Sequence, residues 1–118
     1  MNKRGRLKKR LIGYTFTKAE ICNLDVTLAK YCAEGVRQFI NMERHATPAN
    51  LKRKEWEQIL KDIHWSLNSI ATDYRNEPFY QAVAQEKEKP GIESAKEYSE
   101  KMERGLTLFG KYFVNLWY

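Results

Sequence analysis

The stretch WEQILKDIHWSLNSIATDY, residues 56–74, decides the fold. Its apolar side chains recur every three or four positions, a spacing that places them on one narrow face of an α-helix. The members of this stripe are Trp56, Ile59, Leu60, Ile63, Leu67, Ile70 and Tyr74. We expect a helix over residues 52–74 that buries the stripe in a helical core.

The preceding segment, residues 17–44, has a wider apolar surface. One face carries Leu24, Leu28, Tyr31, Gly35, Phe39 and Met42, and Ala29, Ala33 and Ile40 extend it. The resulting arc of about 200° exceeds what a surface helix needs. We therefore expect residues 17–44 to form the central helix, opened by the capping-box pattern Thr17-Lys18-Ala19-Glu20.

The last helix is expected over residues 93–117, and a further short helix within 79–89. Helix-breaking Pro78 and Pro90-Gly91 separate these segments, and no alternating strand pattern competes with them. The predicted fold is all-α: a single-domain bundle of three long helices plus the short one, covering residues 17–118. We expect its core to join Trp56, Leu28, Phe39, Ile63, Phe109 and Phe113.

Residues 1–16 form a basic N-terminal arm and connector. Every charged residue among the first ten is basic, namely Lys3, Arg4, Arg6, Lys8, Lys9 and Arg10. The other 108 residues balance fifteen basic against fifteen acidic side chains, so the arm carries the whole net charge of +6. Such an arm is either a solubilising tail or a binding element for phosphates or acidic surfaces.

The two cysteines, Cys22 and Cys32, are ten residues apart in one helical segment, which separates them by about 15 Å along the axis. They are too distant to form a disulfide with each other, and two free thiols suit a reducing cytoplasm. The sequence contains no recognisable signal peptide and no apolar run of membrane-spanning length. We expect a cytoplasmic protein that does not enter the membrane.

No catalytic constellation, metal site or cofactor motif is evident. Glu93, Glu97, Glu100 and Glu103 resemble the paired glutamates of magnesium-binding helices, but they lie opposite the apolar stripe of their own helix. We interpret them as a solvated face with i,i+4 pairs from Glu97 to Lys101 and from Glu100 to Arg104. The chain is therefore not expected to be an enzyme.

Two polar residues are candidates for burial. Asp25 lies within the apolar arc of residues 17–44, where a carboxylate needs a paired donor. Alternatively, a shorter helix that starts at Asn23 would place Asp25 in a first turn, where the helix dipole favours it. His64 lies at the border of the stripe in residues 52–74 and is expected to be a hydrogen-bonded boundary residue.

Trp65 lies on the polar side of its helix, near Lys54 and Lys61. A tryptophan that points away from its helix's own core packs on another segment or serves an interface. Three interpretations remain open: docking of the connector at residues 75–92, a partner surface, or stacking of a nucleic-acid base beside the two lysines.

Three segments together resemble a known family: LDVTLAKY at 24–31, EWEQIL at 55–60 followed by Trp65, and ERGL at 103–106 leading into LFGKYF at 108–113. In this order they are similar to small, functionally uncharacterised proteins encoded by tailed phages and prophages. The resemblance covers residues 17–118 and implies an accessory protein in the cytoplasm of a bacterial host. It supplies no catalytic residues.

These observations favour a non-enzymatic phage accessory protein that binds a host or phage protein or nucleoprotein complex, as an anti-CRISPR-like or other anti-defence inhibitor. The first alternative is direct binding of DNA or RNA through the arm. The second is a helical oligomer that sequesters a nucleotide immune signal. The sequence is also compatible with a homo-oligomer.

Overall fold

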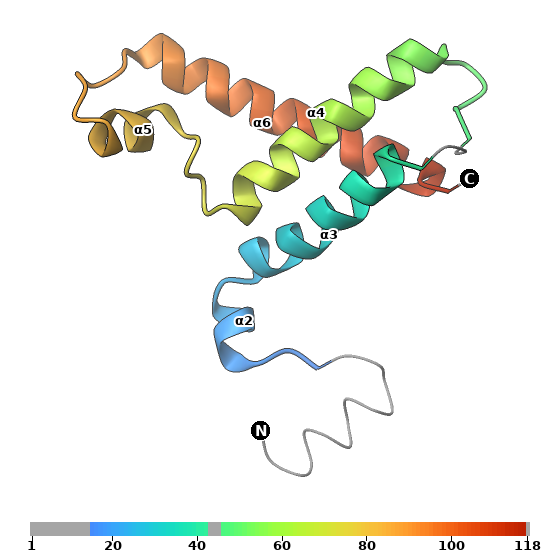
Figure 1. Cartoon of the computed structure of the whole chain (residues 1–118), viewed down its shortest axis with the longest axis horizontal. Helices are drawn as coiled ribbons and strands as arrows, with labels where there is room; N and C mark the ends of the chain where they lie inside the picture. Colours follow the sequence, from blue (N-terminus) through green and yellow to red (C-terminus); the bar gives the residue numbers. More distant parts are fainter. Residues whose placement is uncertain (1–14, 43–45, 118) are drawn as a thin grey trace.

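The computed structural model describes residues 15–42 and 46–117, and these residues are helical without any strand. The helices are α2 (Lys18–Cys22), α3 (Leu24–Ile40), α4 (Arg53–Ala71), α5 (Pro78–Ala84) and α6 (Ile92–Tyr112), followed by the 3-10 helix η1 (Phe113–Asn115). The all-helical class is as predicted. The arrangement differs from the expected one, because α4 rather than the first long helix is central (Figure 1).

Helix α4 packs against α3 on one side and against α6 on the other, whereas the backbones of α3 and α6 do not approach each other closely. Its stripe is buried as expected: Trp56 and Ile63 are fully inaccessible, with Leu60, Leu67 and Ile70 nearly so. Each half of the α4 stripe packs into a different hydrophobic cluster. Ile63 and Leu67 pack with Ala33 and Val36 of α3, while Trp56 and Leu60 pack with Tyr112 of α6.

The expected helix over residues 17–44 is divided at Asn23 and ends at Ile40. The predicted capping box is present, with Thr17 and Glu20 bonded reciprocally at the start of α2. The Thr27 hydroxyl donates to the Glu20 carbonyl at 2.9 Å across the break. This side-chain bond offers the backbone an alternative to a continuous helical ladder.

The predicted core is confirmed for Trp56 and Ile63, which are buried, and for Phe39 and Phe109, which pack against their clusters. It is wrong for Leu28 of α3, which is 47% exposed, and for Phe113 of η1, which is 59% exposed. The buried residues of α3 are the smaller Ala29, Ala33 and Val36, with Phe39 and Ile40 packed against the α4 clusters at the end of the helix. Small side chains let the two helices approach closely, so the larger apolar residues of the arc are left on the outer side.

Helix α4 ends at Ala71 instead of Tyr74. The Thr72 hydroxyl donates to the Asn68 carbonyl at 3.0 Å, and Asp73 and Tyr74 then adopt left-handed φ values of 58° and 61°. The Tyr74 amide closes the end by donating to the Ser69 carbonyl at 2.8 Å. Tyr74 therefore leaves the buried stripe, and its hydroxyl donates to Asp25 at 3.1 Å.

A close helix contact fixes α6 on α4. Gly105 is buried, and a Cβ there would lie 1.8 Å from Ser66 Oγ and 2.5 Å from the Asp62 carbonyl oxygen. The Ser66 hydroxyl donates to the Met102 carbonyl at 3.0 Å. Gly105 is thus required by the distance between the helices. The short helix α5 packs beside α6 at the other end (Figure 1).

Candidate functional site

The acidic side chains of α4 are all engaged within the protein. They are Glu55, which accepts the Lys52 N–H at 3.0 Å; Glu57, which pairs with Arg53 at 3.3 Å; and Asp62, which pairs with Arg104 at 3.7 Å. The two lysines of the same helix, Lys54 and Lys61, are exposed and form no ion pair among the described residues. Their charge is available to an external anion.

Trp65 is half-buried and packs on α6. Its ring meets the ring of Tyr98 edge to face, with centroids 5.5 Å apart. The ammonium group of Lys101 lies over the indole at 4.2 Å from its centroid. This cation–π contact holds a positive charge beside the aromatic ring.

We call Lys54, Lys61, Trp65 and Lys101 the basic-aromatic face. The three residues from α4 lie on one side of that helix, because seven residues make about two turns and four make about one. Helix α6 adds Lys101 from across the contact. Ammonium groups on the same face as a partly accessible indole suit carboxylates or phosphates, which accept hydrogen bonds from lysine.

A chain of three hydrogen bonds positions Tyr98 beside Trp65. The Tyr98 hydroxyl donates to Asn76 Oδ1 at 2.9 Å, and the Asn76 amide donates to Ser69 Oγ at 2.7 Å. Ser69 in turn donates to the Trp65 carbonyl at 2.7 Å. Burial raises the pKa of the Tyr98 hydroxyl, which keeps it a donor. Sequence reasoning missed Ser69 and Asn76, because both look like ordinary surface polar residues.

Asp25 is exposed, so the expectation of a buried carboxylate is wrong. The alternative is correct: Asn23 is the N-cap of α3, and Asp25 lies in the first turn. His64 is half-buried at the border of the stripe, as expected. No hydrogen bond to its imidazole is found in the described part of the chain.

The surroundings of His64 lower its pKa, first through burial and second through the positive charge of Arg37, with Glu34 opposing. Glu34 and Arg37 pair at 2.6 Å on the neighbouring turn of α3. Hydrogen bonds from Arg37 and Gln38 lower the pKa of Glu34 to about 2. This group of residues holds its charges in internal pairs and offers no free anion site.

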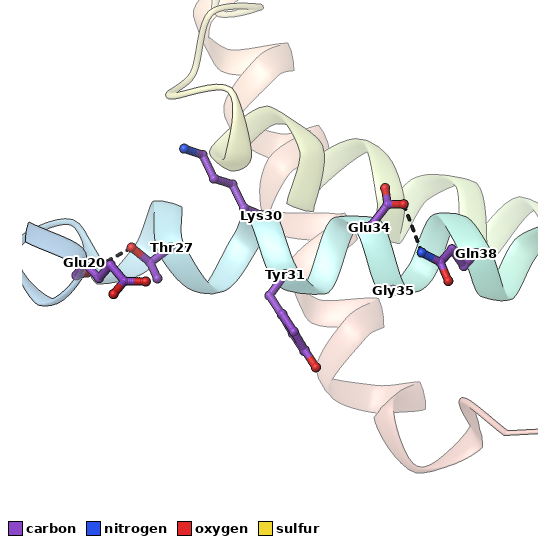
Figure 2. A pocket seen from close by; sticks show the side chains of 7 residues that line it. All are labelled: Glu20, Thr27, Lys30, Tyr31, Glu34, Gly35 and Gln38. Atoms are coloured by element: carbon purple, nitrogen blue, oxygen red, sulfur yellow. Dashed lines mark hydrogen bonds between the residues drawn. The ribbon is translucent and has the colours of Figure 1, made fainter. Parts of the chain in front are cut away.

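A shallow hollow of about 640 Å³ runs along α2 and α3 (Figure 2). Its lining includes one lysine, Lys30, against the two carboxylates of Glu20 and Glu34. Figure 2 shows Lys30 pointing to one side of α3 and Tyr31 to the other. The excess of carboxylates makes this hollow unsuitable for a nucleotide phosphate.

The four glutamates of α6 are exposed, namely Glu93, Glu97, Glu100 and Glu103. Other contacts replace the predicted ion pairs Glu97–Lys101 and Glu100–Arg104. Lys101 lies over the ring of Trp65, and Arg104 pairs with Asp62. Within residues 15–42 and 46–117, no group of acidic, histidine or cysteine side chains could hold a metal ion.

Other predictions from the sequence concern residues that are not part of the basic-aromatic face. The arm residues Lys3, Arg4, Arg6, Lys8, Lys9 and Arg10 lie outside the described residues. Cys22 and Cys32 are free thiols, now in two separate helices, and burial raises the pKa of Cys32. None of the described helices has the length and apolar character to cross a bilayer.

No family model matches this chain, and no curated protein or solved structure matches it either.

Proposed function

We propose that this chain is a non-enzymatic binding protein that attaches to an acidic surface of a host or phage protein complex. The observation that carries the proposal is the basic-aromatic face. Glu57 and Asp62 of α4 form ion pairs with Arg53 and Arg104, whereas Lys54 and Lys61 are exposed on the side of α4 that carries Trp65, where Lys101 lies over the indole. The six basic residues of the arm add charge of the same sign.

The similarity of residues 17–118 to a family of phage and prophage proteins supports a role in the bacterial host cytoplasm. Many phage proteins of this size block enzymes by occupying their surfaces. We therefore propose an anti-defence inhibitor of the anti-CRISPR type, which needs affinity for its target and no chemistry of its own. The single bundle of residues 17–118 serves as the scaffold for the face and for the arm.

Capture of the target from infected cells tests the proposal. Removing both exposed lysines, Lys54→Ala with Lys61→Ala, should weaken retention of the target, and deleting residues 1–10 should weaken it further. The matched control is Lys18→Ala with Lys30→Ala, which removes the same charge from α2 and α3. Equal retention by both lysine pairs would contradict the use of the basic-aromatic face.

Direct binding of DNA or RNA is the second candidate, and the uninterrupted positive charge of residues 1–10 favours it. For duplex DNA, each phosphate neutralised adds a slope of about −0.9 to log K against log salt, so six basic residues give a slope of about −5. Tight, salt-dependent binding to random DNA that vanishes on deletion of residues 1–10 would replace the first proposal with this one.

A further inference from the structure

The C-terminal end of α4 adopts a backbone conformation that its sequence does not favour. Asp73 and Tyr74 have φ values of 58° and 61°, in the left-handed region that residues other than glycine rarely adopt. The step from Ile70 to Tyr74 continues the apolar stripe of α4, and no proline or glycine interrupts the chain before Pro78. The sequence therefore supports a second form of this end, in which α4 continues to Asn76 and Pro78 limits it.

A few hydrogen bonds hold the observed end of α4 in place. The Tyr74 hydroxyl donates to Asp25 Oδ2 of α3 at 3.1 Å, and the Asn76 amide donates to Ser69 Oγ at 2.7 Å. Asp25 and Asn76 are exposed, so water competes for their hydrogen bonds. Each such bond contributes little net free energy, because folding exchanges it for a bond to water. A small number of weak bonds thus opposes the intrinsic preference of the backbone.

The two forms differ in what they do to the basic-aromatic face. In the observed form, Asn76 bridges Ser69 and Tyr98, because it also accepts the Tyr98 hydroxyl at 2.9 Å. If α4 continued to Asn76, that residue would lie about 10 Å along the helix axis from Ser69, too far for a hydrogen bond. Tyr98 would lose its acceptor. Tyr74 would lie on the apolar stripe instead of bonding to Asp25.

We propose that residues 72–77 form a switch that controls the basic-aromatic face. In the observed form, the turn fixes Tyr98 against the ring of Trp65, over which Lys101 lies. In the form with the longer α4, Tyr98 is released and the face loses its fixed arrangement. A partner that binds the assembled face selects the observed form. The link to binding rests on the proposed function, whereas the two forms of α4 do not.

NMR spectroscopy of the full-length chain labelled with fluorotryptophan tests the switch without a partner. The Trp65 resonance, assigned with Trp65→Phe, reports the face. Nuclear Overhauser contacts between residues one turn apart report whether residues 72–76 are helical. Tyr74→Phe with Asn76→Ala removes three hydrogen bonds of the observed form, so the ratio of the longer to the observed form should rise on the order of a hundredfold. The Trp65 resonance should shift, and helical contacts should appear over residues 72–76.

The matched control is Tyr80→Phe with Gln85→Ala, which removes a hydroxyl and an amide from exposed residues of the same connector. It should change neither signal. Adding Asp73→Gly to the first pair should reverse its effect on the order of tenfold, because glycine favours the left-handed conformation and disfavours the helix.

Two results would overturn the switch. One is a Trp65 resonance that stays at its wild-type position in the Tyr74→Phe, Asn76→Ala variant. The other is a shifted resonance while residues 72–76 remain non-helical. A chain that switches as expected but captures no target would keep this inference and contradict only the proposed function.

Discussion

Two helix-interior glycines, Gly105 in α6 and Gly35 in α3, are in opposite environments. At Gly105 there is no room for a methyl group, because Ser66 and the Asp62 backbone of α4 occupy the space. At Gly35 the space is empty. The same residue type therefore maintains a contact inside the chain at one site and leaves a surface open at the other. A glycine of the second kind can be replaced without a clash inside the chain.

The largest expected effect is that of Gly105→Ala. Overpacking a tight contact costs about 1–3 kcal/mol, and the better helix propensity of alanine returns at most about 1 kcal/mol. We expect the free energy of unfolding to fall by about 2 kcal/mol, measured by urea denaturation. Gly110→Ala, an open position on the same helix, is the control and should be neutral or stabilising.

The clash that Gly105→Ala creates can also be reduced by shortening Ser66 on α4. Ser66 supplies two of the three atoms that a Cβ at Gly105 would meet, and the Asp62 carbonyl supplies the third. Ser66→Gly combined with Gly105→Ala should therefore lose less stability than the two single changes added together. Strict additivity would mean that the two helices are not in close contact at this point.

Much of α4 could be predicted from the sequence, because its apolar stripe is narrow and allows only one buried face. The arc of α3 is too wide to fix a single face. Periodicity cannot tell whether Leu28 and Tyr31 or Ala29 and Ala33 meet α4. Helix contacts favour small residues when the backbones come close, and that distance depends on both helices. The sequence therefore favours the larger residues as core, yet Leu24, Leu28 and Tyr31 are exposed, whereas Phe39 packs against the Trp56 cluster.

The proposed basic-aromatic face was predicted in part. Trp65, Lys54 and Lys61 stand out because an aromatic residue on a polar face is unusual. Lys101 could not be associated with them, since its pairing with Trp65 depends on how α6 crosses α4. The sequence instead favoured an intrahelical pair with Glu97. Local i,i+4 pairs contribute only a few tenths of a kcal/mol, so a tertiary contact readily replaces them.

A smaller effect, opposite in sign, is expected for Gly35→Ala. Because a Cβ at Gly35 would meet nothing within 4 Å, alanine should raise the free energy of unfolding by up to about 1 kcal/mol, measured by urea denaturation. Destabilisation by this change would show that Gly35 contacts another part of its own chain.

The smallest effect should come from the solvent side of α6, away from the Gly105 contact. Glu97 and Glu100 are exposed, and the basic residues expected to pair with them are engaged elsewhere. Glu97→Gln and Glu100→Gln should each change the free energy of unfolding by less than about 0.5 kcal/mol, and target binding should be retained. The same variants test the non-enzymatic proposal. If the wild-type chain hydrolysed a nucleotide with magnesium and either variant lost that activity, these glutamates would be metal ligands. The solvated face and the binding-protein proposal would then both be wrong.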